Sequence, residues 1–209
     1  MPEETTHRRR RAPAMSLEDR REAIVQATVP LLFEHGANVT TSQIAEAAGI
    51  AEGTVFRAFK DKQELIRTCV QAVLVADAEL ALIEEARRAG TLAERLSWAA
   101  SAVSGYLDRM WALAGVLRDS GFDPREKHGD HGEHGEHHGP QAQMQRLSER
   151  VASLFEPADH LRVDPSLAAR LLLGLVFTNR MQGKGFGETT ADVDQLVEVF
   201  LHGALRGDQ

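Results

Sequence analysis

The run GTVFRAFKDK, which begins at Gly53, sets hydroxyl, aromatic and cationic side chains close together in the sequence. Thr54 offers a hydroxyl and a methyl group, and Arg57 offers a planar fork of donors that fits a guanine edge or a phosphate. Gly53 has no side chain, so the backbone there can come near a ligand. Groups of this kind bind a polyanion through hydrogen bonds and charge, and they need a rigid element to present them together.

Two short helices that meet at a glycine would position these side chains. Thr40 and Gln43 have the spacing of a capping box, which predicts a helix running through Ala48. Gly49 supplies the turn, and a second short helix is expected over Glu52 to Phe59. This pattern predicts a helix-turn-helix.

The expected helix-turn-helix, residues 40–59, suits the major groove of duplex DNA. That groove is about 12 Å wide and admits one helix, which a second helix braces from above. Side chains of the second helix would face the bases, and those at the neighbouring helix starts would meet phosphates. The candidate DNA contacts are Thr41, Ser42, Gln43, Gly53, Thr54, Phe56, Arg57 and Lys62.

A longer helix is expected before this segment, and another after it. Ser16, with Asp19 three residues later, caps the start of the first, and Gly36 suits its end. Pro30 falls inside this helix, where a proline removes a hydrogen bond, so a kink is expected there. Asp61 caps the helix that follows.

This region resembles a known family. REAIVQATVPLLFEHG and VTTSQIAEAAGIAEGTVFRAFKDKQELI are similar to the helix-turn-helix signature of TetR-type transcriptional repressors. The resemblance implies a DNA-binding domain over 17–77 and a helical domain over 78–209 that binds a small-molecule effector and forms a homodimer. It also implies a double-stranded DNA operator as partner, with Thr41 as a backbone contact and Lys62 as the phosphate-binding lysine.

The sequence departs from the family pattern at three positions. Phe56 stands where a tyrosine is usual and lacks the hydroxyl that would reach a phosphate. Ala58 replaces a frequent histidine or tyrosine. Ala51 stands where a serine usually caps the second helix, which weakens that helix start by ~1 kcal/mol. These departures predict a weaker affinity for DNA, not a different kind of protein.

The charge of the chain is unevenly divided. Residues 1–67 hold ten Lys or Arg and ten Asp or Glu, so the net charge of −7 belongs to residues 68–209. A partner that is a polyanion must therefore bind the N-terminal end. Residues 1–16 are expected to be a disordered arm, and Arg8 to Arg11 in it either enter a minor groove or only raise nonspecific attraction.

The sequence carries no sign of export or of a membrane anchor. The N-terminus lacks the apolar segment of a secretory signal, and the apolar run at 171–177 is too short to cross a bilayer. The single cysteine, Cys69, allows no disulfide within the chain. We expect a cytoplasmic protein that has no membrane partner.

The rest of the chain is helical in pattern and shows no alternation typical of strands, which predicts an all-α protein. Helices are expected near 63–88, 91–120, 141–156, 165–183 and 190–206.

Two of the expected helices have apolar surface to spare. The helix at 165–183 carries two stripes, one of Leu167, Leu171, Leu175 and Thr178 and one of Leu172, Val176 and Asn179. The last helix repeats Val193, Leu196, Val197, Phe200 and Ala204 at helical spacing. These stripes suit a four-helix bundle across a two-fold axis of a homodimer; alternatively, both pack within their own domain.

A group of bulky side chains in the middle helices is the candidate ligand site. It consists of Trp98, Tyr106, Met110, Trp111 and Phe122. Such a cluster either lines an apolar cavity for an effector or is plain core.

A histidine-rich loop at 125–140 is the candidate metal site. Its histidines are His128, His131, His134, His137 and His138. Imidazole and carboxylate side chains suit Zn, Ni or Cu, so a metal-responsive regulator or metal-binding protein is the alternative function. The glycines of the loop favour a solvated segment without a physiological metal, because ordering it would cost much entropy.

The sequence shows no pattern of a catalytic site. It has no phosphate-cradling glycine loop, no nucleophile elbow and no recognisable pair of carboxylates, so we expect neither an enzyme nor a cofactor. The sequence predicts a regulator that binds DNA.

Overall fold

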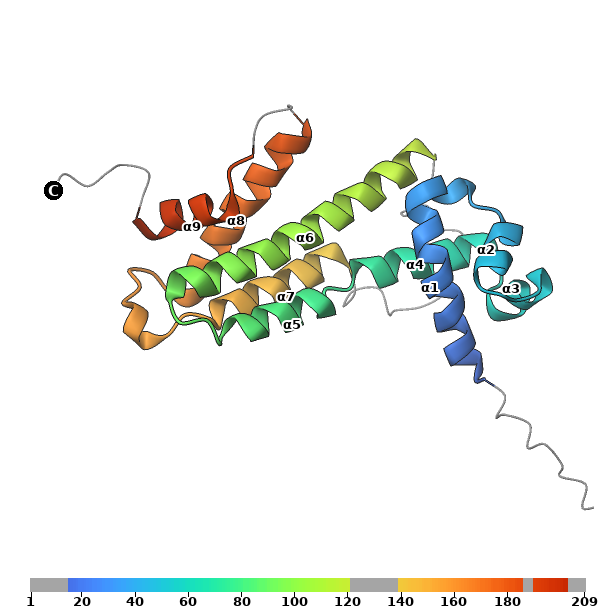
Figure 1. Cartoon of the computed structure of the whole chain (residues 1–209), viewed down its shortest axis with the longest axis horizontal. Helices are drawn as coiled ribbons and strands as arrows, with labels where there is room; N and C mark the ends of the chain where they lie inside the picture. The colour runs from blue at the N-terminus through green and yellow to red at the C-terminus, as the bar shows by residue number, and fades with distance from the viewer. Residues whose placement is uncertain (1–14, 121–138, 186–189, 203–209) are drawn as a thin grey trace, which may run out of the picture.

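The computed structural model describes residues 15–120, 139–185 and 190–202, and within these ranges the regular structure is entirely helical. Figure 1 shows one group of helices at each end of an elongated molecule, with α6 running between them. The first group comprises α1 (Leu17–His35), the short 3₁₀ turn η1 (Gly36–Asn38), α2 (Thr41–Ala47), α3 (Glu52–Ala58) and α4 (Lys62–Leu74). The second comprises α5 (Asp77–Ala86), α6 (Leu92–Asp119), α7 (Pro140–Ala152), η2 (Pro157–Asp159), α8 (Pro165–Gly185) and α9 (Val193–His202).

The starts of the N-terminal helices are fixed by local side chains, as the sequence predicts. The Ser16 hydroxyl accepts the Asp19 N–H, and the Asp19 carboxylate accepts the Ser16 N–H, which completes a capping box at α1. Asp61 caps α4 by accepting the Glu64 N–H at 2.7 Å. Helix α1 continues across Pro30, and a kink there stays a prediction.

The end of α1 depends on a glycine. Gly36 has a φ of +60°, and a Cβ on it would lie 2.9 Å from the Ser120 side chain and from the Val116 carbonyl. The Ser120 hydroxyl, at the end of α6, accepts the Ala37 N–H at 3.0 Å. A residue without a side chain is therefore needed where α1 meets α6.

The N-terminal helices share one apolar core. Ile44 of α2, Val55 of α3 and Phe59 are buried in it together with Leu32 and Leu65. Leu113 and Leu117, from the second half of α6, belong to the same core. Helix α6 therefore serves both groups of helices.

The expected helix at 63–88 is wrong as a single helix, because the chain breaks between α4 and α5. Val75 is extended, with φ −68° and ψ 129°. The break frees backbone groups that side chains from other helices satisfy. The Tyr106 hydroxyl donates to the Leu74 carbonyl at 3.1 Å, and the Ala76 N–H donates to Oε1 of the buried Gln143 at 3.2 Å.

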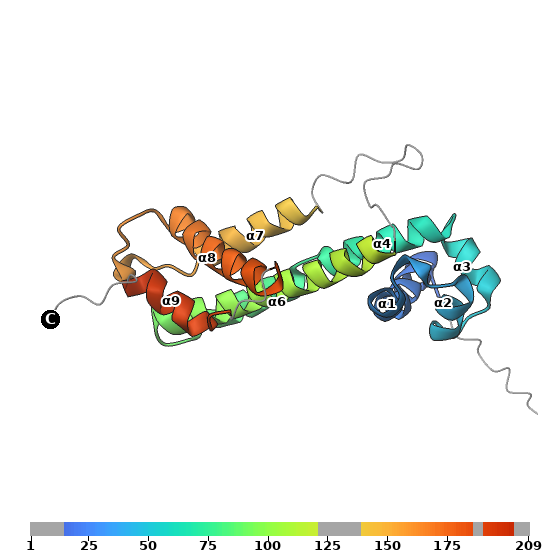
Figure 2. The ribbon, with the colours of Figure 1, turned by 90° about the horizontal axis from the view of Figure 1, so that it is seen from above.

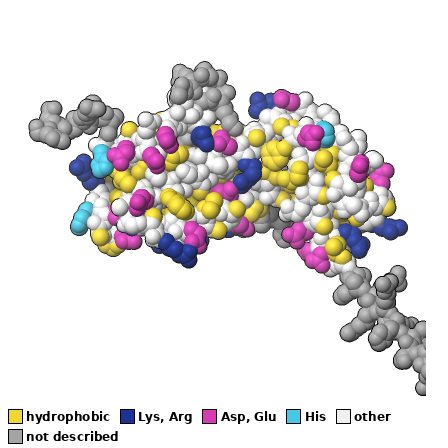
Figure 3. Space-filling model, viewed as in Figure 1, with side chains coloured by type: hydrophobic (Ala, Val, Ile, Leu, Met, Phe, Trp, Pro, Cys, Tyr) yellow, Lys and Arg dark blue, Asp and Glu magenta, His cyan; other side chains and the backbone are white. Residues whose placement is uncertain are grey.

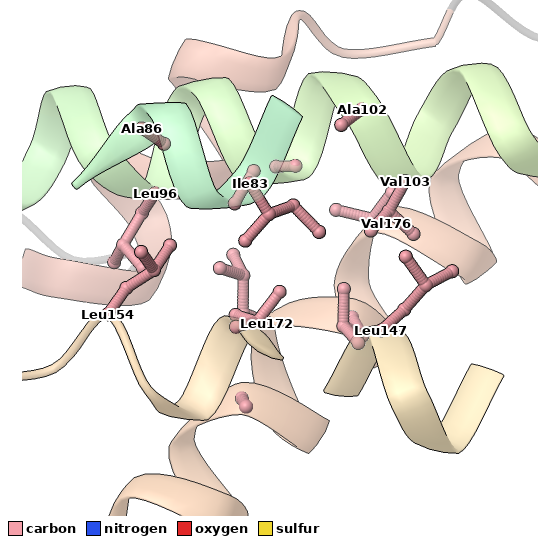
Figure 4. Packing of buried hydrophobic residues seen from close by; sticks show 14 of the residues in the cluster. Ile83, Ala86, Leu96, Ala102, Val103, Leu147, Leu154, Leu172 and Val176 are labelled. Carbon is pink, nitrogen blue, oxygen red and sulfur yellow. The ribbon is translucent and has the colours of Figure 1, made fainter. Parts of the chain in front are cut away.

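The C-terminal helices pack around a second core in which small side chains alternate with large ones. Figure 4 shows Ile83 of α5, Val103 of α6, Leu147 of α7 and Leu172 of α8 among its members. Alanines of α6 and α8 are buried there as well, which lets these helices approach closely: Ala99, Ala100, Ala102, Ala168 and Ala169.

Two other boundaries differ from expectation. Helix α7 ends at Ala152 rather than at 156, and the chain then forms η2, where the Asp159 carboxylate accepts two hydrogen bonds from Arg95 at 3.1 Å. Helix α9 begins at Val193 rather than at 190, because the Asn179 amide bonds both the N–H and the carbonyl of Ala191. The expected end of that helix, 203–206, lies outside the described residues.

None of the helices within the described ranges is long and apolar enough to cross a membrane.

Candidate nucleic-acid interface

The turn between α2 and α3 sets the angle at which α3 projects from the molecule. Gly49 has a φ of +64°, a conformation that favours glycine, and the Ile50 N–H donates to the Ala45 carbonyl at 3.0 Å. Val55 and Ala58 hold one face of α3 in the N-terminal core. The opposite face is open to solvent at the far end of the molecule (Figure 2).

The open face of α3 carries the candidate DNA contacts. Gly53, Phe56 and Arg57 are exposed there, and Phe56 is 53 % exposed. A Cβ on Gly53 would meet no atom within 4 Å, so neither packing nor its conformation requires a glycine in the free protein. Arg57 has no hydrogen-bond or ion-pair partner in the described part of the chain. Thr54, half-buried, lies at the edge of this face.

The start of α2 is held by the predicted capping box. Thr40 accepts the Gln43 N–H at 3.2 Å, and Gln43 Oε1 accepts the Thr40 N–H at 2.8 Å. The amide oxygen of Gln43 is thus engaged within the box, which leaves its NH₂ group for another acceptor. Ser42 is exposed beside it.

The Thr41 hydroxyl donates its hydrogen bond to the Glu52 carboxylate, at the first turn of α3. A phosphate offers only acceptors, so this hydroxyl can reach one only after it leaves Glu52. Glu52 also places a negative charge at the start of α3, whose N-cap residue, Ala51, makes no capping bond, as the sequence predicts.

The other end of α3 is braced by Arg21 of α1. Its guanidinium donates to the Ala58 carbonyl, pairs with Glu64 at 2.7 Å and lies 4.1 Å from the centre of the Phe59 ring. Burial would raise the pKa of Glu64, but the hydrogen bonds from Arg21 and from the Lys60 N–H outweigh it and leave this pKa below its ordinary value.

Arg21 and Glu64 were missed by sequence reasoning because they are 43 residues apart and neither lies in the helix-turn-helix. The double arginine at 20–21 was the available signal. Lys62, a predicted phosphate contact, is the first residue of α4 and is half-buried. Figure 3 shows Lys and Arg side chains projecting at the end formed by α1 to α3, with Asp and Glu side chains nearby.

Comparison with known proteins identifies this domain. Residues 24–69 match the model of the bacterial regulatory proteins of the tetR family. The N-terminal domain belongs to the TetR family. The matched segment contains α2, α3 and most of the core around them, so the helix-turn-helix that the sequence predicts is confirmed as a TetR-type DNA-binding element.

Solved TetR-type structures share the architecture of the rest of the chain. A structure from Mesorhizobium loti, assigned to the TetR family of transcriptional regulators, matches with a TM-score of 0.63 and 18 % identity over 90 % of this chain and 95 % of that chain. A tetR-family regulator from Streptomyces coelicolor gives a TM-score of 0.56 and 20 % identity over 89 % and 80 % of the two chains.

A third match is FadR of Bacillus subtilis in complex with stearoyl-CoA, with a TM-score of 0.54 and 18 % identity over 87 % of this chain and 98 % of that chain. At these identities the likeness concerns the fold, which is all-α with an N-terminal helix-turn-helix domain, as expected.

The structure does not bring the candidate ligand residues together at one cavity. Trp98 is 59 % exposed, whereas Tyr106 is 1 % exposed within the C-terminal core. Trp111, half-buried, packs against Phe177 of α8 with ring centres 5.5 Å apart, and Met110 is half-buried at the edge of the core. The fifth candidate, Phe122, lies outside the described residues.

The basic arm and the candidate metal ligands also lie outside the described residues. This holds for Arg8 to Arg11 and for His128, His131, His134, His137 and His138. Within the described ranges, no group of three or more His, Cys, Asp or Glu side chains could hold a metal ion. The comparisons favour a transcriptional regulator over the metal-binding alternative.

Proposed function

We propose that this protein is a homodimeric transcriptional repressor that binds a near-palindromic operator and is released from it by a small-molecule effector. The open face of α3 on a TetR-type domain, with Arg57 exposed and unpaired in the described chain, is the observation that carries the proposal. Insertion of α3 into the major groove would place Arg57 and Thr54 at base edges, and Lys62 and the start of α2 at phosphates.

The exposed face of α8 supports a homodimer. Leu171 is 51 % exposed, and Leu175 and Thr178 continue the same stripe one and two turns on. Val199 of α9 is exposed as well. A two-fold axis through this face would make the surface self-complementary and give two copies of α3, which could meet half-sites about 34–36 Å apart.

The joint between α4 and α5 offers a path for release. Helix α4 carries the DNA-binding core, and its last carbonyls accept hydrogen bonds from Tyr106 and Arg109 of α6. An effector that moves α6 or α7 would move α4 with them, provided that it binds better to the state that cannot hold DNA. FadR of Bacillus subtilis, which shares the fold, binds stearoyl-CoA. A protein that acts in this way on the chromosome works in the cytoplasm.

The proposal is tested by selecting duplexes from a random DNA pool with the full chain and measuring affinity for the selected duplex by fluorescence anisotropy. Arg57→Ala should weaken binding about 5- to 150-fold, because a bidentate contact to a base provides about 1–3 kcal/mol of discrimination. Arg162→Ala is the matched control, since Arg162 is exposed in the C-terminal half, far along the chain from α3.

If Arg57→Ala and Arg162→Ala lose equal DNA affinity, the binding is nonspecific electrostatic attraction, which contradicts the proposed orientation of α3. Failure to enrich any duplex would contradict the proposed function itself. A change of oligomeric state is scored separately, by light scattering of the same preparations.

A further inference from the structure

Trp98 is an unusual residue on the surface of the C-terminal domain. Tryptophan is mostly buried in folded proteins, yet this side chain is 59 % exposed, and Leu82 of α5 is 51 % exposed. The two line the same hollow on the surface. Tryptophan is enriched at binding surfaces, because its ring joins a large apolar face to a polar N–H.

The hollow lies between α5, α6 and α9 and has a volume of about 730 Å³. Its floor includes the buried side chains Ala102 and Val197. We call it the Trp98 groove; a volume of this size falls in the range of sites for small organic molecules, about 300–1,000 Å³.

The charges that line the Trp98 groove have one sign. Glu94 of α6 and Asp194 and Glu198 of α9 line it, and no Lys, Arg or His is among its lining residues. Hydrogen bonds from the Thr91 hydroxyl and N–H hold the pKa of Glu94 below its ordinary value, so this carboxylate is charged at neutral pH. Glu198 lies 3.7 Å from His202, a side chain outside the lining.

We propose that the Trp98 groove binds a small organic cation, with the cationic group over the indole ring of Trp98. A tryptophan face is the strongest aromatic partner of a cation, and the carboxylates around it add a favourable potential. The apolar floor and Leu82 would cover the hydrocarbon part of the ligand. The inference rests on the proposed function only in naming the chemical class of effector; the binding itself can be measured without DNA.

A second copy of the chain is a poorer occupant of this groove. In a two-fold contact the same patch meets itself, so the carboxylates of one copy would face those of the other without cations between them. The exposed stripe on α8, with Leu171 and Leu175, offers an apolar surface for that contact instead.

The test is titration calorimetry of the full chain with benzyltrimethylammonium, compared with N-benzylacetamide, which is similar in size and uncharged. The cation should bind at least about tenfold more tightly than the neutral compound. Trp98→Leu keeps apolar bulk but removes the ring, and it should weaken cation binding about tenfold. In a Trp111→Phe variant, whose only tryptophan is Trp98, the cation should change the fluorescence with the same affinity.

Charge is tested with Glu94→Gln, which retains the capping box because glutamine also serves at that position. Combined with Glu198→Gln it should weaken cation binding several-fold and flatten its dependence on salt, whereas Glu22→Gln on α1 should change nothing. Equal affinity for the charged and neutral compounds, or unchanged binding in Trp98→Leu, would overturn the inference. Since DNA affinity is measured separately, these failures leave the proposed function standing, and loss of DNA binding alone leaves this inference standing.

Discussion

The N-terminal and C-terminal helices differ in how completely they bury their apolar side chains. Between residues 18 and 81, Phe56 is the one large apolar side chain that is exposed, and it lies on the face expected to meet DNA. The second half exposes Leu82, Trp98, Val163, Leu171, Leu175, Phe177, Met181 and Val199. The first half buries its large apolar side chains, with Leu113 and Leu117 of α6 completing its core, whereas the second half presents apolar surface that a monomer leaves uncovered.

This difference has a physical meaning. A domain that holds one helix at a fixed angle for a rigid ligand such as DNA benefits from a core of large, interlocked side chains. A domain that binds a second copy and a small molecule must keep apolar surface available, at a cost in its own burial. The four predictions that follow test this contrast, from the largest expected effect to the smallest.

The contrast depends most on the α8 face, so charges there should separate the subunits. Leu171→Glu with Leu175→Glu would bury four carboxylates at a two-fold contact, which should raise the dimer dissociation constant roughly a thousandfold or more. Light scattering across a dilution series measures the mass. Leu82→Glu is the control, exposed to the same extent on another helix, and it should remain dimeric. A double variant that remains dimeric would move the interface elsewhere.

The N-terminal core should be intolerant of loss of volume. Ile44→Ala removes a fully buried side chain and should lower the free energy of unfolding by about 2–5 kcal/mol. Burial raises the pKa of the Cys69 thiol to about 12, so alkylation by iodoacetamide at pH 8 reports opening of this core. Alkylation should accelerate in Ile44→Ala and stay slow in Leu82→Ala. Similar rates in the two variants would erase the contrast between the regions.

The joint between the regions depends on a buried polar contact. Gln143→Leu leaves the Ala76 N–H without its acceptor and should lower the free energy of unfolding by about 1–3 kcal/mol. Hydrogen exchange of the Ala76 amide should accelerate because the amide has lost its hydrogen bond. Gln145→Leu, which changes an exposed side chain on the same helix, should leave that exchange rate unaltered. Slow exchange of that amide in Gln143→Leu would show that another group supports the break.

The smallest effect is expected on the exposed aromatic of α3. Phe56→Tyr adds a hydroxyl at a position where it can reach a phosphate, and one such hydrogen bond should strengthen DNA binding about 2- to 10-fold. Anisotropy titration with the selected duplex measures it. Unchanged stability of the free protein is the control, and an unchanged affinity would place this residue away from the DNA backbone.

Sequence reasoning succeeded where structure is set locally. The caps at Ser16, Thr40 and Asp61 and the turn at Gly49 each depend on residues a few positions apart, and all four are as predicted. Local chemistry of this kind is written in the sequence, so the shape of the helix-turn-helix could be predicted from it.

Sequence reasoning failed where contacts between distant helices determine a helix break or the burial of a side chain. No glycine or proline marks the break after Leu74, which is stabilised by side chains on α6 and α7. Trp98 and Tyr106 lie on one helix, yet one is exposed and the other buried, because the neighbouring helices cover only part of α6. Burial depends on tertiary packing, which spacing along a single helix does not determine.

Helix α6 connects these two kinds of structure in a way that constrains engineering. Its 28 residues extend about 42 Å, and while its first half lies in the C-terminal core, Leu113 and Leu117 lie in the N-terminal one. A hybrid regulator that joined foreign DNA-binding helices at Val75 alone would therefore confront them with mismatched leucines. A viable graft needs a second crossover inside α6, so that the last turns of α6 come from the same protein as α1 and Gly36, against which they pack.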